Sequence, residues 1–362
     1  MRVLFVSKPI VPPWSDGSKC LVRDVAGALK IAEPTVMVSP GGPSVGARVR
    51  RENVYGHAAR FSPSQNALVF NRLVFGDPLD LWHFVFAPNA ASSSAAHLAI
   101  RSQRSRGWKG KVVQTIASRP KSFERSRALY FGDRIVALSE HTRGMLLRAG
   151  VADGIVRVIP PCVAEPRATR SAEEVRERLD LGPGPLVVYP GDLHVSSGAA
   201  TVALAAPEVL CAVPGARFVF ACRRKGRDAS YEAGLHEALR GLEPFVRVLG
   251  EVDDMHALLA AADVIAFPVD DLYGKIDLPI VLLESMALRK PLVLASGGPL
   301  DELPGRFVSP RDHAELAREL VELCRDGRAR DELGALGRSA WSKRHTPEVV
   351  GAQHDALYAE LC

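Results

Sequence analysis

The fold of this chain is decided by residues 267–295, which read FPVDDLYGKIDLPIVLLESMALRKPLVLA. The stretch opens at the end of an apolar run over 264–267 and closes with another over 292–295, and both runs predict buried strands. Between them, an apolar helix is predicted to begin near Pro279, a favourable residue for a first helical turn. A strand, a loop, a helix and a second strand in this order indicate one crossover of a parallel sheet.

Charged residues in this stretch are concentrated in the loop. The loop carries Asp270, Asp271, Lys275 and Asp277, whereas the helix holds a single carboxylate, Glu284, before its basic end. A carboxylate on so apolar a helix needs a partner if it is buried. Glu284 is therefore a candidate for ligand binding, and a plain surface glutamate is the alternative.

The same alternation of apolar runs and helix patterns extends along both halves of the chain. Strands are predicted at 2–6, 35–38, 81–86, 112–116, 134–138 and 155–159, and again at 186–189, 217–221, 246–249, 264–267 and 292–295. Helices are predicted around 21–29, at 140–149 with Ser139 as N-cap, and at 199–213, 254–262 and 279–288. Two such series indicate two doubly wound α/β lobes.

A boundary between the lobes is visible near residue 165. Pro160 and Pro161 end the first series of strands, and the run GPGP at 182–185 introduces the second, with a polar segment between them. Doubly wound sheets bind ligands beyond the carboxyl ends of their strands. The sequence therefore predicts that the ligand binds between the two lobes.

The composition agrees with two folded domains. The chain has 362 residues, of which 47% are hydrophobic and 24% charged, so a disordered chain is excluded. The six cysteines form no Cys-x2-Cys pair, which excludes a zinc ribbon and a small disulfide-bonded scaffold. The apolar run at 3–6 is too short for a signal peptide, and no stretch fits a membrane span, so we expect a cytoplasmic protein.

The charge is distributed unevenly. Residues 1–130 carry 19 Lys and Arg against 7 Asp and Glu, a net charge of +12, and the remainder carries 27 against 34, or −7. Basic residues gather at 48–51, 101–111 and 119–127. A solvated surface is the simplest explanation, and an anionic acceptor or an anionic membrane surface is the functional alternative. Nucleic acid is disfavoured because aromatic residues make up only 6% of the chain and no nucleic-acid-binding motif accompanies the charge.

Common catalytic motifs are absent from the sequence. It has no Walker A motif, no Gly-x-Gly-x-x-Gly after the first strand, no His-Glu-x-x-His and no Gly-x-Ser-x-Gly, which disfavours P-loop ATPases, common dehydrogenases, zincins and serine hydrolases. The loop at 8–18 could bring backbone N–H groups to a phosphate, with Gly17 permitting close approach. An ordinary connecting loop is the alternative.

These segments together resemble the retaining glycosyltransferases of family 4, which have the GT-B fold of two Rossmann-like domains facing a central cleft. The resemblance is carried by LWHF at 81–84, DRIVALSEHT at 133–142, VRVIPPCV at 156–163, LAAADVIAFP at 259–268, and IVLLESMA at 280–287 with KPLVLAS at 290–296. It implies an acceptor-side domain at 1–165, a nucleotide-sugar domain at 166–345, and a final helix within 346–362 that packs back onto the first domain.

The chain departs from the family pattern at its charged positions. Asp192 and Ser197 stand where the family has the Arg and Lys that hold the donor diphosphate. The first Glu of Glu-x7-Glu falls on Ile276, beside Asp277, and Glu284 is the second. Loss of both cations removes charge stabilisation unless other cations, such as Lys275 or the basic run at 223–225, replace them.

The resemblance implies a retaining, metal-independent transfer of a sugar from a nucleotide-diphosphate sugar, without a cofactor, in polysaccharide or glycoconjugate biosynthesis. It implies Lys275 and Asp277 as catalytic residues. The implied donor-binding residues are Gly17, Gly191, Asp192, Ser197, Arg223, Leu278, Pro279, Ile280, Val281 and Glu284, and the acceptor-side residues are His83, Ser118 and Arg119. The acceptor would be a glycan, a lipid-linked molecule or a small molecule, with peripheral contact to an anionic membrane. The alternatives are a non-catalytic GT-B relative that acts as a binding or scaffold protein and, less favoured, a sugar-nucleotide epimerase or hydrolase.

Overall fold

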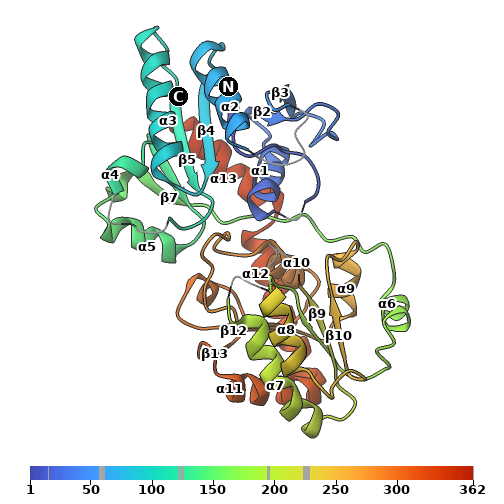
Figure 1. Cartoon of the computed structure of the whole chain (residues 1–362). Coiled ribbons are helices and arrows are strands. Elements are labelled where there is room, and N and C mark those ends of the chain that lie inside the picture. Colours follow the sequence, from blue (N-terminus) through green and yellow to red (C-terminus); the bar gives the residue numbers. More distant parts are fainter. Residues whose placement is uncertain are drawn as a thin grey trace. The chain divides into compact units, whose positions relative to one another are not determined.

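A computed structural model describes residues 1–14, 16–56, 62–120, 123, 126–193, 196–222 and 229–361. The chain forms two compact units (Figure 1). Unit 1 comprises Met1–Ala164, Tyr273–Ile280 and Arg344–Cys362, and unit 2 comprises Glu165–Leu272 and Val281–Lys343. Each unit is built around its own parallel β-sheet.

The sheet of unit 1 has the strand order β3-β2-β1-β4-β5-β6-β7, and all its strands pair in parallel. Its strands are β1 (Arg2–Val6), β2 (Glu33–Val38), β3 (Arg50–Asn53), β4 (Leu81–Phe86), β5 (Lys111–Ile116), β6 (Arg134–Ala137) and β7 (Val156–Val158). The predicted strands of this half are confirmed, and β3 is added at one edge. β3 escaped prediction because its four polar residues carry no apolar pattern.

The sheet of unit 2 has the order β10-β9-β8-β11-β12-β13, again all parallel. Its strands are β8 (Leu186–Tyr189), β9 (Arg217–Ala221), β10 (Val246–Leu249), β11 (Val264–Phe267), β12 (Leu292–Ala295) and β13 (Arg306–Val308). The first five confirm the predicted strands. Their residues are almost wholly buried in β8, β9, β11 and β12, as expected for strands covered on both faces.

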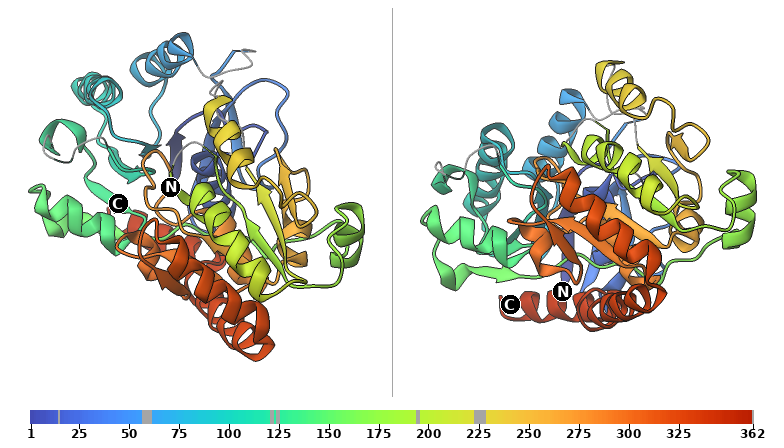
Figure 2. Two further views of the ribbon diagram at one scale, coloured as in Figure 1. Left: turned by 60° about the horizontal axis from the view of Figure 1, so that its bottom comes forward. Right: turned by 90° about the horizontal axis from the view of Figure 1, so that it is seen from below.

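Helices connect the strands in both units. Those of unit 1 are α1 (Gly17–Ala28), α2 (Pro63–Phe75), α3 (Ala90–Ser105), α4 (Ser126–Leu129), α5 (Glu140–Arg148) and α13 (Pro347–Ala359). The second series is α6 (Ala172–Arg178), α7 (Gly198–Ala212), α8 (Ala229–Ala238), α9 (Met255–Ala261), α10 (Ile280–Ala287), α11 (His313–Arg325) and α12 (Gly327–Arg344). Figure 2 shows the helices of unit 2 beside its sheet, where α7 packs against α11. None of the helices within the described residues combines the length and the apolar composition that a membrane span requires.

Helix α13 belongs to unit 1 although it follows the whole of unit 2 in sequence. Asp355 accepts hydrogen bonds from three successive backbone N–H groups after α1, those of Lys30, Ile31 and Ala32, at 2.9–3.1 Å. Gly351 faces the backbone of Ala28 so closely that a β-carbon would lie 2.4 Å from its carbonyl oxygen. Close backbone approach and a buried carboxylate therefore fix α13 against α1.

The segment 273–280 also lies in unit 1, whereas the sequence analysis assigned it to the second domain. Ile276 is 5% exposed and packs in the apolar core of unit 1. The absence of a side chain at Gly17 makes room for it, because a β-carbon there would lie 3.3 Å from Ile276 Cδ1. Burial of this one apolar side chain brings the polar loop to the start of α1.

Candidate functional site

In unit 2, the carboxylate of Glu284 lies in the second turn of α10 and is 19% exposed. Its Oε1 atom lies 3.1 Å from Nε2 of His256, and Nδ1 of His256 lies 3.1 Å from the carbonyl oxygen of Arg167. The hydrogen bond to Glu284 raises the pKa of His256, and partial burial opposes this shift. A carboxylate offers several acceptor positions, so Glu284 can bind ligand hydroxyls beside this contact.

His256 was not singled out by the sequence. It lies at the start of α9, whose N-cap Asp254 accepts a hydrogen bond from the backbone of Ala257. Nothing in its spacing from Glu284 indicates a contact, because the two helices meet only through the tertiary fold.

The end of β8 and the start of α7 bring together the positions where the resemblance implied cations. Asp192 is 6% exposed, and Gly191 must lack a side chain because a β-carbon would lie 2.4 Å from the Tyr189 ring. The backbone N–H of Ser197 donates to Oδ1 of Asp270 at 3.0 Å. This edge of the sheet therefore holds two largely buried carboxylates, Asp192 and Asp270.

Asp270 also accepts a hydrogen bond from Nε of Arg311, at 2.7 Å, and its side chain is 8% exposed. Burial opposes its ionisation, but the hydrogen bonds from Arg311 and Ser197 outweigh burial and lower the pKa of Asp270. Arg311 is thus a cation that the sequence analysis missed, and it is engaged in an ion pair within unit 2.

In unit 1, Lys275 lies near the N-terminus of α1. Burial lowers the pKa of Lys275 to about 8, and the nearby carboxylate of Asp16 opposes that shift. Asp16 is the N-cap of α1, where its Oδ1 atom accepts from the backbone N–H of Ser18 at 2.9 Å. The structure therefore places Lys275 and Gly17, both singled out from the sequence, beside the same helix terminus.

Asp277 is directed away from solvent. Its carboxylate is 2% exposed and accepts a hydrogen bond from Oγ of Ser139 at 2.5 Å. The same Oγ atom accepts from the backbone N–H of Thr142 at 3.0 Å and caps α5, as predicted. A carboxylate so enclosed anchors the loop to α5, and the catalytic role of Asp277 stays a prediction.

The residues that follow lead directly into α10. Leu278 is 1% exposed, so its side chain belongs to the core, and Pro279 precedes the first helical residue. Ile280 and Val281, in the first turn, are partly buried. These four residues supply backbone and apolar surface at the start of the helix that carries Glu284.

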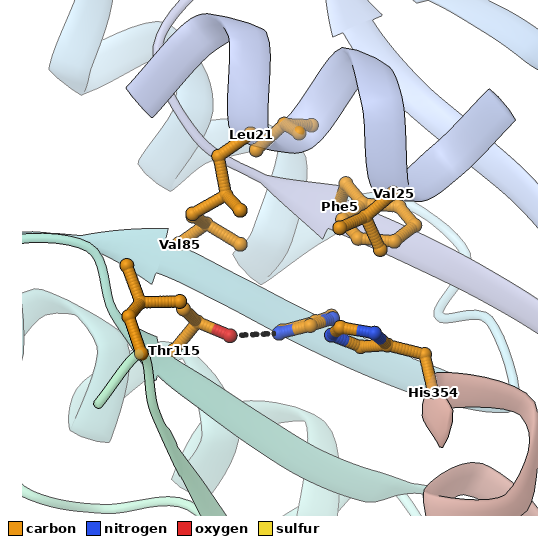
Figure 3. A pocket seen from close by; sticks show the side chains of 9 residues that line it. Phe5, Leu21, Val25, Val85, Thr115 and His354 are labelled. Atoms are coloured by element: carbon orange, nitrogen blue, oxygen red, sulfur yellow. Dashed lines mark hydrogen bonds between the residues drawn. The ribbon is translucent and has the colours of Figure 1, made fainter. Parts of the chain in front are cut away.

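Of the acceptor-side residues, His83 lies in the core. It is 1% exposed, and its ring nitrogens lie 2.6 Å from the hydroxyl oxygens of Tyr358 and Thr115. Burial, with the nearby His354, lowers its pKa well below the usual range. Figure 3 shows the small, mainly apolar cavity beside this network. Both ring nitrogens of His83 serve internal hydrogen bonds, and its assignment as an acceptor-side residue stays a prediction.

Ser118 and Arg119 follow β5. Ser118 is 8% exposed, and Arg119 is partly buried. Arg223 and the rest of the basic run at 223–225 lie outside the described residues. Within the described part of the chain, no group of three or more His, Cys, Asp or Glu side chains is arranged to hold a metal ion.

Comparison with known proteins gives the geometry a family context. Residues 184–326 match the family model described as Glycosyl transferases group 1. The matched segment contains β8, the residue Asp192 that follows this strand, and the helix α10 that carries Glu284. No curated protein shows significant sequence similarity to the chain.

Solved structures show the same fold over the whole length. HepE of Anabaena, in complex with UDP-glucose, has a TM-score of 0.76 at 17% identity, with 100% of both chains covered. Sucrose-phosphate synthase of Thermosynechococcus elongatus has a TM-score of 0.75 at 18% identity, covering 99% of this chain and 98% of that one. A glycosyltransferase of Rickettsia africae has a TM-score of 0.74 at 17% identity, with 99% and 98% covered. The predicted GT-B fold, with two Rossmann-like α/β domains, is confirmed.

Proposed function

We propose that this protein is a glycosyltransferase that takes a sugar from a nucleotide-diphosphate sugar. The observation that carries the proposal is the partly exposed Glu284 carboxylate, which His256 holds on α10 inside the segment that matches the group 1 family model. Fold similarity to HepE, whose structure contains UDP-glucose, supports a donor of the same class.

In the proposed reaction, Glu284 accepts hydrogen bonds from the ribose hydroxyls, and the start of α10 lies near the diphosphate. The transition state at the anomeric carbon is oxocarbenium-like, so the departing diphosphate needs compensating positive charge. Lys275 supplies part of that charge. The acceptor hydroxyl attacks the anomeric carbon from the face that the diphosphate leaves and passes its proton to the departing diphosphate, which retains the anomeric configuration, and the reaction needs no metal ion.

We propose that unit 1 receives the acceptor and that this acceptor is anionic or presented at an anionic membrane surface. Exposed apolar side chains on α2 and α3, namely Leu68, Phe75 and Leu98, lie on helices that pack together, and exposed Arg101 and Arg106 follow on α3 and at its end. Such a combination suits peripheral attachment on the cytoplasmic side. The structure of WaaG, a glycosyltransferase involved in lipopolysaccharide biosynthesis, has a similar fold and agrees with a glycoconjugate acceptor.

Removal of the Glu284 carboxylate tests the proposal. Glu284→Ala should weaken binding of UDP by about ten- to a hundredfold in a calorimetric titration, because a pair of charge-assisted hydrogen bonds is lost. Glu208→Ala, at an exposed position of α7, is the matched control and should bind like the wild type. Equal nucleotide binding by Glu284→Ala and the control would refute the proposal. ADP and GDP are titrated in parallel to identify which nucleotide base the protein prefers.

A second candidate function is nucleotide-sugar binding without transfer. It is favoured by Asp192 and Asp270, two carboxylates at the sheet edge where the resemblance implied diphosphate-binding cations. Measurement of nucleotide release from a panel of sugar nucleotides, with and without a lipid extract, separates the two candidates. Release supports the transferase, and binding without release supports the second candidate.

A further inference from the structure

Three lysines of unit 1 gather around one carboxylate. Nζ of Lys8 lies 2.7 Å from Oδ2 of Asp16, and Nζ of Lys19 donates to the carbonyl oxygen of Val11 at 3.0 Å. Asp16 interacts electrostatically with Lys19 and with Lys275. The ammonium groups of Lys8, Lys19 and Lys275 therefore all feel the charge of the Asp16 carboxylate.

The positions of these side chains follow from the packing already described. Lys8 follows β1, Lys19 lies in the first turn of α1, and Lys275 is brought to the same helix end because Ile276 packs against Gly17. Three segments far apart in sequence thus direct positive charge to one place. Lys8 and Asp16 remain accessible, with 45% and 36% of their side chains exposed.

Burial disfavours the charged forms of Lys19 and Lys275. Burial lowers the pKa of Lys19, and the charge of Lys8 lowers it further while Asp16 opposes the shift. The pKa of Lys275 is likewise lowered. A second anion would stabilise the charged forms of both lysines, and partial removal of water strengthens that attraction.

We propose that Lys8, Lys19 and Lys275 form a binding site for a phosphoryl anion, in which the ligand displaces the Asp16 carboxylate from Lys8. Two sources offer this chemistry: the diphosphate of the nucleotide sugar and a phosphate on the acceptor. The assignment of the source rests on the proposed function, whereas the site itself does not.

Removal of the Asp16 carboxylate should increase the affinity of the site for an anion. Asn caps a helix about as well as Asp, so Asp16→Asn keeps the N-cap and removes only the competing charge. Pyrophosphate affinity should then rise by about three- to tenfold. A purely structural role of the cluster predicts no gain, because Asp16→Asn would merely lose the ion pair with Lys8.

The lysine variants should act in the opposite direction. In titrations with pyrophosphate at low salt, Lys8→Gln, Lys19→Gln and Lys275→Gln should each weaken binding by about three- to tenfold, and the triple variant by more than about a hundredfold. Lys30→Gln, at an exposed position in the same unit, is the matched control. Unchanged binding by the triple variant, or no gain in Asp16→Asn, would overturn the proposal.

Further titrations identify the source of the phosphoryl group. If the lysine variants weaken the binding of UDP but not that of uridine, the site holds the donor diphosphate. If the lysine variants weaken the binding of glucose 6-phosphate but not that of UDP, the site holds an acceptor phosphate. Should the wild type bind pyrophosphate through the lysines but no nucleotide through Glu284, the site stands and the proposed function fails.

Discussion

The carboxylate of Glu284 and the imidazole of His256 lie 28 positions apart in sequence and hydrogen-bond between two helices. Glu284 could be selected from sequence because it is the single carboxylate in an apolar helix. His256, Asp277 and His83 show what the sequence does not reveal. A residue type predicts possible chemistry, but the direction of the side chain depends on the packing of other segments, which buried Asp277 and His83.

The hydrogen bond between His256 and Glu284 should be detectable as a raised pKa of His256. The folded state raises the pKa of His256, so the stability from this pair is complete below the ordinary pKa of about 6.5 and is lost as the pH rises through the raised value. Glu284→Gln should lower the pKa measured by NMR from the imidazole protons. His256→Gln, which keeps a donor, should retain more nucleotide affinity than His256→Leu. An unchanged titration in Glu284→Gln would contradict the pairing.

At the scale of elements, the predicted strands and most predicted helices lie close to the observed bounds. Strand runs such as 81–86 and 217–221 coincide with β4 and β9 because a strand buried on both faces needs a continuous apolar run. Two of the elements that were missed lack such a pattern. β13 is only three residues long, and α3 carries alanines and serines over its first two turns.

The contact between α1 and α13 should depend on the missing side chain of Gly351. Gly351→Ala should destabilise the protein by about 1–3 kcal/mol, although alanine favours a helix, because the β-carbon would meet the backbone of Ala28. Gly144→Ala in α5 is the control, since its β-carbon would meet only the flexible end of Arg148, at 3.4 Å. Urea unfolding measures both variants. Equal stability of the two would show that the helices can move apart at little cost.

At the scale of the whole molecule, two doubly wound lobes could be predicted from the alternation of strands and helices, and the GT-B fold from the resemblance, but the composition of the units could not. Pro160 and Pro161 precede the change of unit after Ala164, and prolines interrupt regular structure. No comparable sequence signal indicates that residues 273–280 belong to unit 1. Their membership of unit 1 depends on one apolar side chain, Ile276, that finds its place beside Gly17 only in the folded state.

The basic first 130 residues predict attachment to anionic membranes. Co-sedimentation should show binding to vesicles that contain anionic lipid, little binding to neutral vesicles, and release as salt rises from about 0.1 to 1 M. Charge reversal at Arg101 and Arg106 should weaken binding to anionic vesicles more than charge reversal at Arg104, because Arg104 already forms an ion pair with Asp133 at 3.6 Å. Arg318→Glu, at an exposed position of α11 in unit 2, is the control. Equal binding to neutral and anionic vesicles would favour a soluble acceptor.

The membership of α13 in unit 1 has a consequence for biosynthesis. Roughly 180 residues separate Ala164 from Pro347, and at translation rates of about 5–20 residues per second they take about 10–40 s to synthesise. During that interval the nascent first sheet lacks Tyr358 for His83 and the helix that covers α1. Unit 1 therefore cannot finish folding before unit 2 has left the ribosome, and its uncovered apolar face is the surface that chaperones would meet first.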